Sequence, residues 1–588
     1  MPIYPKMRFQ QTEQDVIDGF GGYDHRLRIG DGAWYDTKNL SSDHAPLLST
    51  RKRRADTHRR ARALLEKQAL AYVGEDGTLY YNFLPTPVTG LSSGDKQLVG
   101  MGAYIVVFPD KVYLNTEDQT DHGSLEAFYG PQSASYELCR FDGTAVSAAY
   151  TQSSEPAAPQ NGEYWIDSSE PRRVLRQWSQ AQGQWISVES VYLRVRFTTL
   201  GAIPSLFRVN DAVTISGSSA EELNGTKVVR ALGGGGNERD WILVDALPDL
   251  GLGTEEESLS LSRSVPPLDF VCECQNRLWG CRYGIGEDGR AVNEICCSAL
   301  GDFRNWRRFE GLSADAWYAS VGSDGPWTGA VNYLGSPIFF KENRIHRVSV
   351  SAEGAHSVAE TVCRGVQRGS AKSLAVVNET LFYKSPAEVC AWQGGFPRSV
   401  SAPLGAVSYH AAVGGVIGGK YYLSMLDEAG QSVLFVYDIE RELWLREDEL
   451  RVTDFARVGG ELYAVSGGEL LALLGSTELN GSTREDTLAW SATTGIQAFR
   501  LPENKRVSRY NIRLSMAAGA SLGVDVQYDS DGVWHSAGSV TASGAGTGHF
   551  LFPVRPHRCD HLQLRLSGQG EMRLLSISRI LETGSDYR

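Results

Sequence analysis

Short runs of alternating apolar and polar residues dominate the chain and predict β-strands. Leu79–Phe83 and Tyr104–Phe108 are typical, because turn-forming Gly, Asp or Pro residues bound each of them. Helical periodicity is convincing only around residues 60–70, whose basic start suits a helix N-terminus poorly. The chain is therefore predicted to be all-β. The same pattern returns in the segments Arg277–Cys281, Pro337–Phe340, Leu381–Tyr383, Tyr421–Leu423, Leu434–Tyr437 and Leu462–Val465.

The spacing of these strands favours a β-propeller. From about residue 265 to 475 a short aromatic-rich strand recurs, often followed by a hairpin, with Gly-rich connections between the units. Asn276–Trp279 leads to a strand and then to Trp306, and Gly419–Tyr422 leads to Tyr437-Asp438 and then to Trp444. A four-stranded unit of this kind cannot bury both of its faces alone, so several must stack in a ring. A set of β-sandwiches has similar strand spacing and remains the alternative.

Two stretches interrupt the blade pattern and define the predicted domains. Residues 156–190 form a hairpin module with three tryptophans, and the alternation of 207–215 suggests a small β-barrel. Pro266-Pro267 marks the return to the main body, and alternating runs after about residue 486 suggest a separate sandwich. We therefore expect N-terminal strands and first blades in 1–145, inserted β modules in 146–264, remaining blades in 265–480 and a C-terminal β-sandwich in 481–588.

Composition narrows the class of protein. The chain has 588 residues, 63 of them Gly, only nine Cys and a net charge of −13. These values exclude collagen-like, disulfide-framework and disordered proteins, and no apolar run reaches the length of a membrane span. The acidic balance argues against a general nucleic-acid coat, because neutralising phosphates needs a basic surface. The N-terminus lacks an apolar signal region, so we expect synthesis in a cytosol without a secretory signal.

Candidate chemistry is sparse. Five cysteines lie between Cys272 and Cys297, but their spacing lacks paired zinc knuckles, so buried packing explains them better. Residues 529–532 (Asp-Ser-Asp-Gly) resemble the start of a calcium loop without its later ligands, which favours a hairpin turn with Gly532 at positive φ. Nucleophile elbows, zinc-protease motifs and P-loops are absent from the sequence. We expect no catalytic residue, metal or cofactor, and not an enzyme, although a propeller mouth could assemble paired carboxylates for glycoside cleavage.

One patch of the acidic chain is strongly basic, with seven cations within twelve residues. It is either a solvated loop or docking surface for an acidic neighbour, or a contact for DNA phosphates. Its members are Arg51, Lys52, Arg53, Arg54, Arg59, Arg60 and Arg62.

Several motifs resemble those of phage and prophage virion proteins of the tail-nozzle or head-stabilisation type. The N-terminal segment Phe20–Ile29 leads to Asp31–Leu40, a Pro-containing turn and the basic run. Ser298–Trp306 is similar to an S-x-L-G-D-x-x-x-W blade of that family, and Phe339–Arg347 resembles the strand pair that follows it. The C-terminal segment 574–586 is similar to the C-terminal ends of such proteins in prophages of Gram-positive bacteria.

The resemblance implies a homo-oligomeric ring of six propeller subunits at the head-to-tail or tail-nozzle position, which seals and guides the genome. Its partners would be copies of itself, portal, adaptor or other tail proteins, and viral DNA in the lumen without sequence specificity. The protein would be made and assembled in the bacterial cytoplasm and reside in the virion. The alternative is a tail-tip or surface propeller that binds a carbohydrate or receptor. A third hypothesis is a polysaccharide-cleaving enzyme, which only the fold would support.

Overall fold

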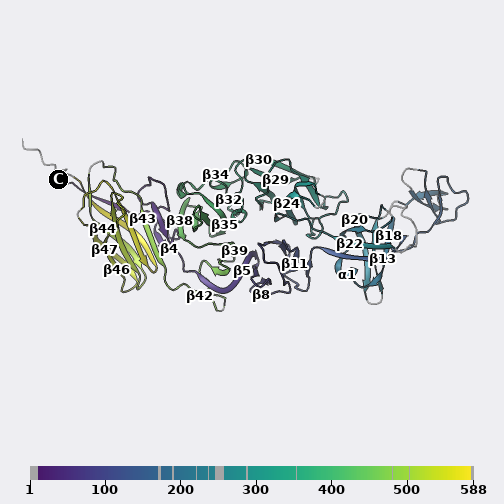
Figure 1. Ribbon diagram of the computed structural model, residues 1–588, viewed down its shortest axis with the longest axis horizontal. Coiled ribbons are helices and arrows are strands. Elements are labelled where there is room, and N and C mark those ends of the chain that lie inside the picture. Colours follow the sequence, from purple (N-terminus) through teal and green to yellow (C-terminus); the bar gives the residue numbers. More distant parts are fainter. Residues whose placement is uncertain are drawn as a thin grey trace, which may run out of the picture.

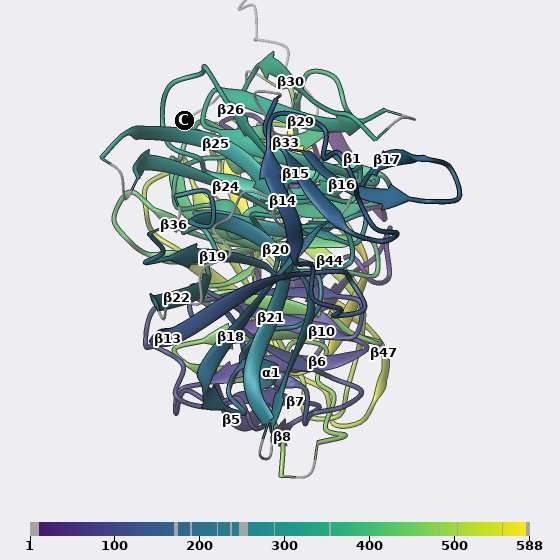
Figure 2. The same ribbon diagram turned by 90° about the vertical axis from the view of Figure 1, so that its right-hand side faces the viewer.

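The computed structural model describes residues 11–583, apart from 170–173, 189–190, 220, 236–237, 246–256, 287–288, 352–353, 480, 502–503 and 556. Three parts follow one another along an elongated molecule, as Figure 1 shows: a sandwich, a propeller in the middle and an inserted barrel with a small sheet at the far end. Figure 2 looks along the long axis from the side of the insertion. The predicted class, an all-β propeller with an inserted barrel and a sandwich, is confirmed. No helix among the described residues has the length and apolar character needed to cross a membrane.

Seven four-stranded blades make up the propeller within the described residues. Each blade is an antiparallel meander, and its first strand packs beside the first strands of neighbouring blades. Blades 1 to 3 contain β5 (Ala55–Lys67), β6 (Ala69–Gly74), β7 (Leu79–Tyr81) and β8 (Leu84–Pro85); β9 (Gln97–Met101), β10 (Tyr104–Phe108), β11 (Val112–Asn115) and β12 (His122–Ser124); and β23 (Phe270–Cys274), β24 (Arg277–Ile285), β25 (Ala291–Cys297) and β26 (Trp317–Ser320).

The later blades follow the same order, with two short 3₁₀ helices, η1 (Ala371–Ser373) and η2 (Ala402–Leu404), between them. Blades 4 and 5 contain β27 (Gly329–Tyr333), β28 (Ser336–Lys341), β29 (Arg344–Val350) and β30 (His356–Val362); and β31 (Ala375–Val377), β32 (Thr380–Lys384), β33 (Val389–Trp392) and β34 (Arg398–Ser399). Blades 6 and 7 contain β35 (Tyr409–Ile417), β36 (Lys420–Asp427), β37 (Ser432–Asp438) and β38 (Leu443–Asp448); and β39 (Asp454–Val458), β40 (Glu461–Ser466), β41 (Glu469–Ala472) and the first half of β5.

Strand β5 closes the ring because it belongs to two blades. Its first half pairs with β41 of blade 7, with Ala55 opposite Ala472. Its second half pairs with β6 of blade 1, with Lys67 opposite Ala69. A register shift between Ala61 and Ala63 separates the two halves, and such a bulge lets a strand change direction and side-chain face. This break in the two-residue period accounts for the helix-like pattern of residues 60–70.

The insertion begins at β13, earlier than the predicted boundary at residue 146. Six strands close into a barrel with a buried apolar interior. A separate four-stranded sheet projects from it and contains the three tryptophans Trp165, Trp178 and Trp185. The barrel contains β13 (Ala127–Cys139), β18 (Tyr192–Leu200), α1 (Ile203–Leu206), β19 (Ala212–Ser216), β20 (Gly225–Gly235), β21 (Glu238–Asp245) and β22 (Glu257–Arg263); the small sheet contains β14 (Ala148–Gln152), β15 (Tyr164–Asp167), β16 (Val174–Ser179) and β17 (Gln184–Ser187).

Both ends of the chain build the sandwich, whereas the sequence analysis placed its N-terminal strands with the first blades. Strand β1 pairs with β49, and β2 pairs with β43. The two sheets enclose one apolar core, to which Phe20, Trp34 and Leu40 of the N-terminal segment contribute. Its strands are β1 (Gln11–Ile17), β2 (Trp34–Lys38), β3 (Leu40–Ser41), β4 (Leu48–Thr50), β43 (Ala489–Thr494), β44 (Arg506–Met516), β45 (Ser521–Tyr528), β46 (His535–Thr541), β47 (Gly546–Pro553), β48 (Leu562–Gln569) and β49 (Met572–Thr583), and β42 (Thr483–Arg484) pairs with β5 beside it.

The ring closure makes a stability prediction at Ala61. Its side chain is fully buried, and its backbone N–H donates to the carbonyl of Gly468 in blade 7 at 2.9 Å. We expect Ala61→Pro to lower the free energy of unfolding by about 1–3 kcal/mol, because it leaves that carbonyl unpaired. Urea unfolding followed by tryptophan fluorescence measures the change. Ala61→Ser, which keeps the N–H, is the control, and equal midpoints for the two variants would contradict this role of β5.

Candidate functional site

The seven cations of the basic patch do not form one exposed surface. Arg51 and Arg54 are buried, with only 6% and 5% of their surface exposed. Lys52, Arg59 and Arg60 are exposed, while Arg53 and Arg62 are half-buried. The patch begins in the linker from β4 to β5 and continues along β5. The first and fourth members are therefore unavailable to an outside ligand.

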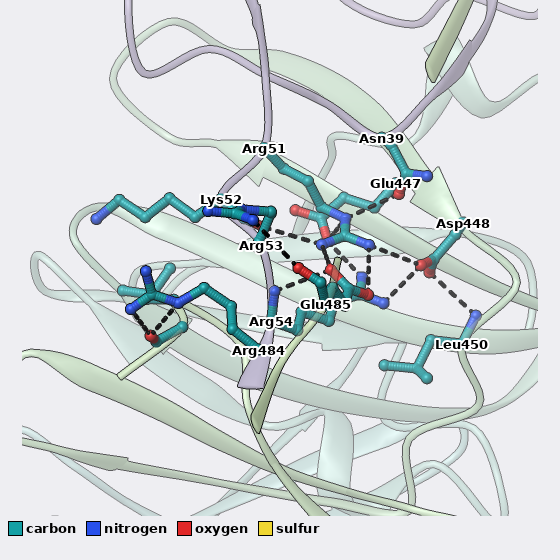
Figure 3. Close-up of polar contacts among 12 residues, drawn as sticks. Asn39, Arg51, Lys52, Arg53, Arg54, Glu447, Asp448, Leu450, Arg484 and Glu485 are labelled. Carbon is teal, nitrogen blue, oxygen red and sulfur yellow. Dashed lines mark hydrogen bonds and ion pairs between the residues drawn. The ribbon is translucent and has the colours of Figure 1, made fainter. Parts of the chain in front are cut away.

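The two buried arginines hold three distant segments together (Figure 3). Arg54 binds Glu447 at 2.7 Å and Asp448 at 2.5 Å, both at the end of β38. Arg51 binds Glu485, which precedes β43, at 2.8 Å. The linker, the edge of blade 6 and the start of the C-terminal part of the sandwich are thus locked by charge-assisted hydrogen bonds, which are stronger than neutral ones.

Burial and the arginines pull the pKa values of these carboxyls in opposite directions. Burial raises the pKa of Glu447, because the two guanidinium groups offset the loss of solvation only in part. Burial also acts to raise the pKa of Asp448, but Arg54 and Arg51 hold it below its usual range. The pKa of Glu485 is also lowered, since Arg51 outweighs its partial burial. This cluster is a structural ion-pair network.

The other members of the patch make weaker contacts near the surface. Arg60 binds Glu75 at 2.6 Å with both side chains largely exposed. Arg62 donates to the backbone carbonyl of Glu75 at 2.8 Å. Arg53 donates to the backbone carbonyl of Asp486 at 3.2 Å. Whether the exposed members contact DNA or a partner stays a prediction.

A second candidate site, which we call the axial cavity, has a volume of about 630 Å³ and lies at the end of the propeller where the first strands of the blades begin. Residues of blades 2, 3, 4 and 6 and of the segments that lead into blades 5 and 7 line it, and Phe270, Val413 and Met425 give it apolar walls. Lys372, which lines the cavity, binds Asp454 at 2.8 Å. Burial raises the pKa of Asp454 even though Lys372 opposes the shift. A buried carboxyl with a raised pKa has one property of a general acid.

The cysteines between 272 and 297 pack as apolar residues, as the sequence analysis predicted. All five are buried in the cores on either side of blade 3. Burial raises the pKa of the Cys274 thiol to about 12 and that of Cys297 to about 11, so both are protonated at neutral pH. Within the part of the chain that the structure describes, no group of three or more His, Cys, Asp or Glu side chains is arranged to hold a metal ion.

The Asp529–Gly532 segment is the turn between β45 and β46, as predicted, with φ of 80° at Gly532. The Asp529 carboxylate accepts hydrogen bonds from the backbone N–H groups of Asp560 and His561, at 2.8 and 3.2 Å. It therefore ties the turn to the neighbouring loop.

The motifs singled out in the sequence occupy contacts between modules. The backbone N–H of Tyr23 donates to the carbonyl of Trp444 in blade 6 at 2.5 Å. A Cβ on the preceding Gly22 would lie 2.2 Å from that oxygen, so only glycine allows the approach. In blade 3, the Asn305 side chain accepts a hydrogen bond from the backbone N–H of Ala212 in the barrel at 2.8 Å and donates to Asp302 at 2.6 Å. Sequence reasoning identified these motifs without revealing that they join the modules.

Comparisons with known proteins bear on the fold. No protein-family model and no curated protein matches the sequence. Among solved structures, an exo-β-1,3-galactanase from Phanerochaete chrysosporium with galactose shares 9% identity over 53% of this chain and 94% of its own, with a TM-score of 0.22. A glycoside hydrolase family 43 arabinoxylan arabinofuranohydrolase from Bacillus subtilis, in complex with cellotetraose, shares 9% sequence identity over 52% of this chain and 94% of its own, with a TM-score of 0.16. BamB from Moraxella catarrhalis shares 10% sequence identity over 47% of this chain and 87% of its own, with a TM-score of 0.20.

These similarities correct one expectation. The sequence analysis expected a protein that is not an enzyme, because no catalytic motif was found. That expectation is contradicted, since glycoside hydrolases are among the solved structures that are similar to this chain. The reason is physical: a propeller assembles a site from residues of several blades, so no local motif needs to mark it.

The buried network predicts unequal effects of two arginine substitutions. We expect Arg54→Met to lower the free energy of unfolding by about 3–5 kcal/mol, because it leaves Glu447 and Asp448 without their partner in a buried site. Arg60→Met, which removes an exposed pair with Glu75, should change it by less than about 1 kcal/mol. Chemical denaturation of the two variants beside the parent protein measures both values. Similar small effects would show that the network contributes little to stability.

Proposed function

We propose that the protein is a structural subunit of a bacteriophage or phage-derived particle. Copies of it would form a ring at the head-to-tail or tail-nozzle position that seals and guides the genome. In this proposal it is made in the bacterial cytoplasm, resides in the virion and contacts portal, adaptor or other tail proteins. Viral DNA would pass without sequence-specific contacts.

The observation that carries the proposal is where the virion-like motifs lie. The segment around Gly22 and Tyr23 joins the sandwich to blade 6, and the loop around Asn305 joins the barrel to blade 3. The motifs that resemble those of virion proteins thus connect the sandwich, the propeller and the barrel to one another. Such a role is expected of a subunit whose work is mechanical.

The distribution of exposed apolar side chains also supports assembly. Phe396 between β33 and β34 is 80% exposed, Ile285 at the end of β24 is 81% exposed, and Leu334 between β27 and β28 is 59% exposed. Covering large apolar side chains with a partner lowers the free energy, because it removes their surface from water. Blades 3, 4 and 5 therefore each carry an exposed apolar side chain that contact with a neighbouring copy would cover.

The proposal predicts a closed oligomer. We expect the purified full-length protein, alone or mixed with a portal protein, to give a discrete multiple of the 64.4 kDa chain and ring-shaped particles. Native mass measurement and negative-stain electron microscopy test this. Phe396→Asp should weaken assembly without changing the unfolding midpoint, whereas Val533→Asp in the sandwich serves as a control at another exposed position. A monomer at every concentration, with and without portal protein, would contradict the proposal.

A second candidate, carbohydrate binding or cleavage, is favoured by two specific features. Trp178 and Trp185 of the small sheet are half-buried with ring centroids 5.5 Å apart, and aromatic rings of this kind can stack on sugars. The axial cavity lies beside Asp454, whose pKa is raised. Binding of glycans by a monomer would favour this candidate. Release of sugar that Asp454→Asn abolishes and Asp525→Asn in the sandwich leaves unchanged would favour cleavage and replace the structural role.

A further inference from the structure

A cleft of about 630 Å³ lies between the sandwich and the propeller, separate from the axial cavity. One wall is the linker after β4, including Lys52 and Arg53. Another is the start of β49 with Arg573, and a third is β42 with Arg484. We call this feature the cationic cleft, since five of its lining side chains are Lys or Arg and two are Asp or Glu.

Three cations of the cleft form no ion pair with a carboxylate among the described residues, although the charge of Lys52 also lowers the pKa of Asp43. Arg484 donates to the backbone carbonyl of Gly475 at 3.0 and 2.5 Å. Arg573 binds the His44 ring at 2.9 Å. Lys52 is exposed, and Figure 3 shows its side chain extending away from the buried network, on the same side as Arg484. Neutral partners orient such groups without cancelling their charge.

The two carboxylates of the cleft, in contrast, each lie beside a cation. Asp43 binds Lys420 at 2.5 Å, and Lys420, with the Ser41 hydroxyl, lowers the pKa of Asp43 against the opposing effect of burial. Glu571 lies 3.6 Å from Arg53. The positive charge of the cleft is therefore in excess, although the whole chain carries −13.

The buried network fixes the cleft in place. Arg51 and Arg54 are engaged on its inner side and anchor the linker on which Lys52 and Arg53 stand. A site whose groups are positioned before binding loses less conformational entropy when the ligand arrives. The basic run in the sequence thus has two roles: its buried members support the exposed ones.

We propose that the cationic cleft binds the phosphate backbone of a nucleic acid. Separate Lys and Arg groups around an open cleft match the repeated charges of a phosphodiester chain. No Phe, Tyr or Trp lines the cleft, so stacking on such rings adds nothing, and we expect binding that is independent of sequence. A peptide that binds by strand addition is less suited, because the lining strands β44 and β49 are paired along both edges. The proposal takes its biological setting from the proposed function.

The test uses the full-length protein and a fluorescent single-stranded oligonucleotide of about 12 thymidines. We expect binding by fluorescence anisotropy at about 50 mM salt and a steep loss of affinity by about 200 mM. The double variant Arg484→Gln/Arg573→Gln should lose at least about tenfold in affinity and reduce the salt slope by about 1.4, or about 0.7 for each lost contact with a single strand. The matched control Arg347→Gln/Arg398→Gln removes the same charge from exposed positions of blades 4 and 5 and should leave binding unchanged.

Three results would overturn the inference. They are an absence of oligonucleotide binding at low salt, equal losses in the two double variants, and binding of inorganic phosphate or hexaglutamate without binding of the oligonucleotide. Binding of phosphate alone would assign the cleft to a small anion, and binding of hexaglutamate to an acidic protein partner. Ring formation is measured separately, so failure here leaves the assembly result standing, and the reverse also holds.

Discussion

The rest of the structure depends on one strand being shared by two blades. A blade exposes both of its faces unless neighbours cover them, so an open array of blades would leave its first and last members half solvated. Here β5 pairs with β41 on one half and with β6 on the other, and the ring closes through backbone hydrogen bonds. The buried arginines stand immediately before this strand. They fix the point at which the chain leaves the sandwich, and therefore the register in which β5 enters the ring.

The general architecture could be predicted from the sequence because it follows from local patterns. Alternation of apolar residues, turn residues between runs and recurrent aromatic strands are sufficient to indicate blades, an inserted barrel and a sandwich. The burial of the cysteines near Cys296 and the turn at Gly532 follow from the same rules. The module boundaries could not be read in this way. Strands β1 to β4 look like any other strands, and only their long-range pairing with β43 and β49 assigns them to the sandwich.

The candidate sites were harder to predict for a related reason. A run of cations in the sequence gives no sign of which members will meet carboxylates from residues some 400 positions away, as Arg54 meets Glu447 and Asp448. The axial cavity gathers residues from four blades and from the segments before two others, and the cationic cleft gathers them from both ends of the chain. Composition therefore indicates that charge is concentrated, while topology decides whether that charge is buried or available.

The pairing of β1 with β49 also sets the order of events during synthesis. Residues 11–17 cannot reach their partner until residues 572–583 have left the ribosome. At roughly 5–20 residues per second, the N-terminal strand waits on the order of half a minute to two minutes. Blades can form in turn during that interval, but the sandwich that clasps them is completed last. A subunit with a finished sandwich has therefore already made all of its blades and its insertion, which keeps chains that stop before residue 572 out of any assembly that recognises this module.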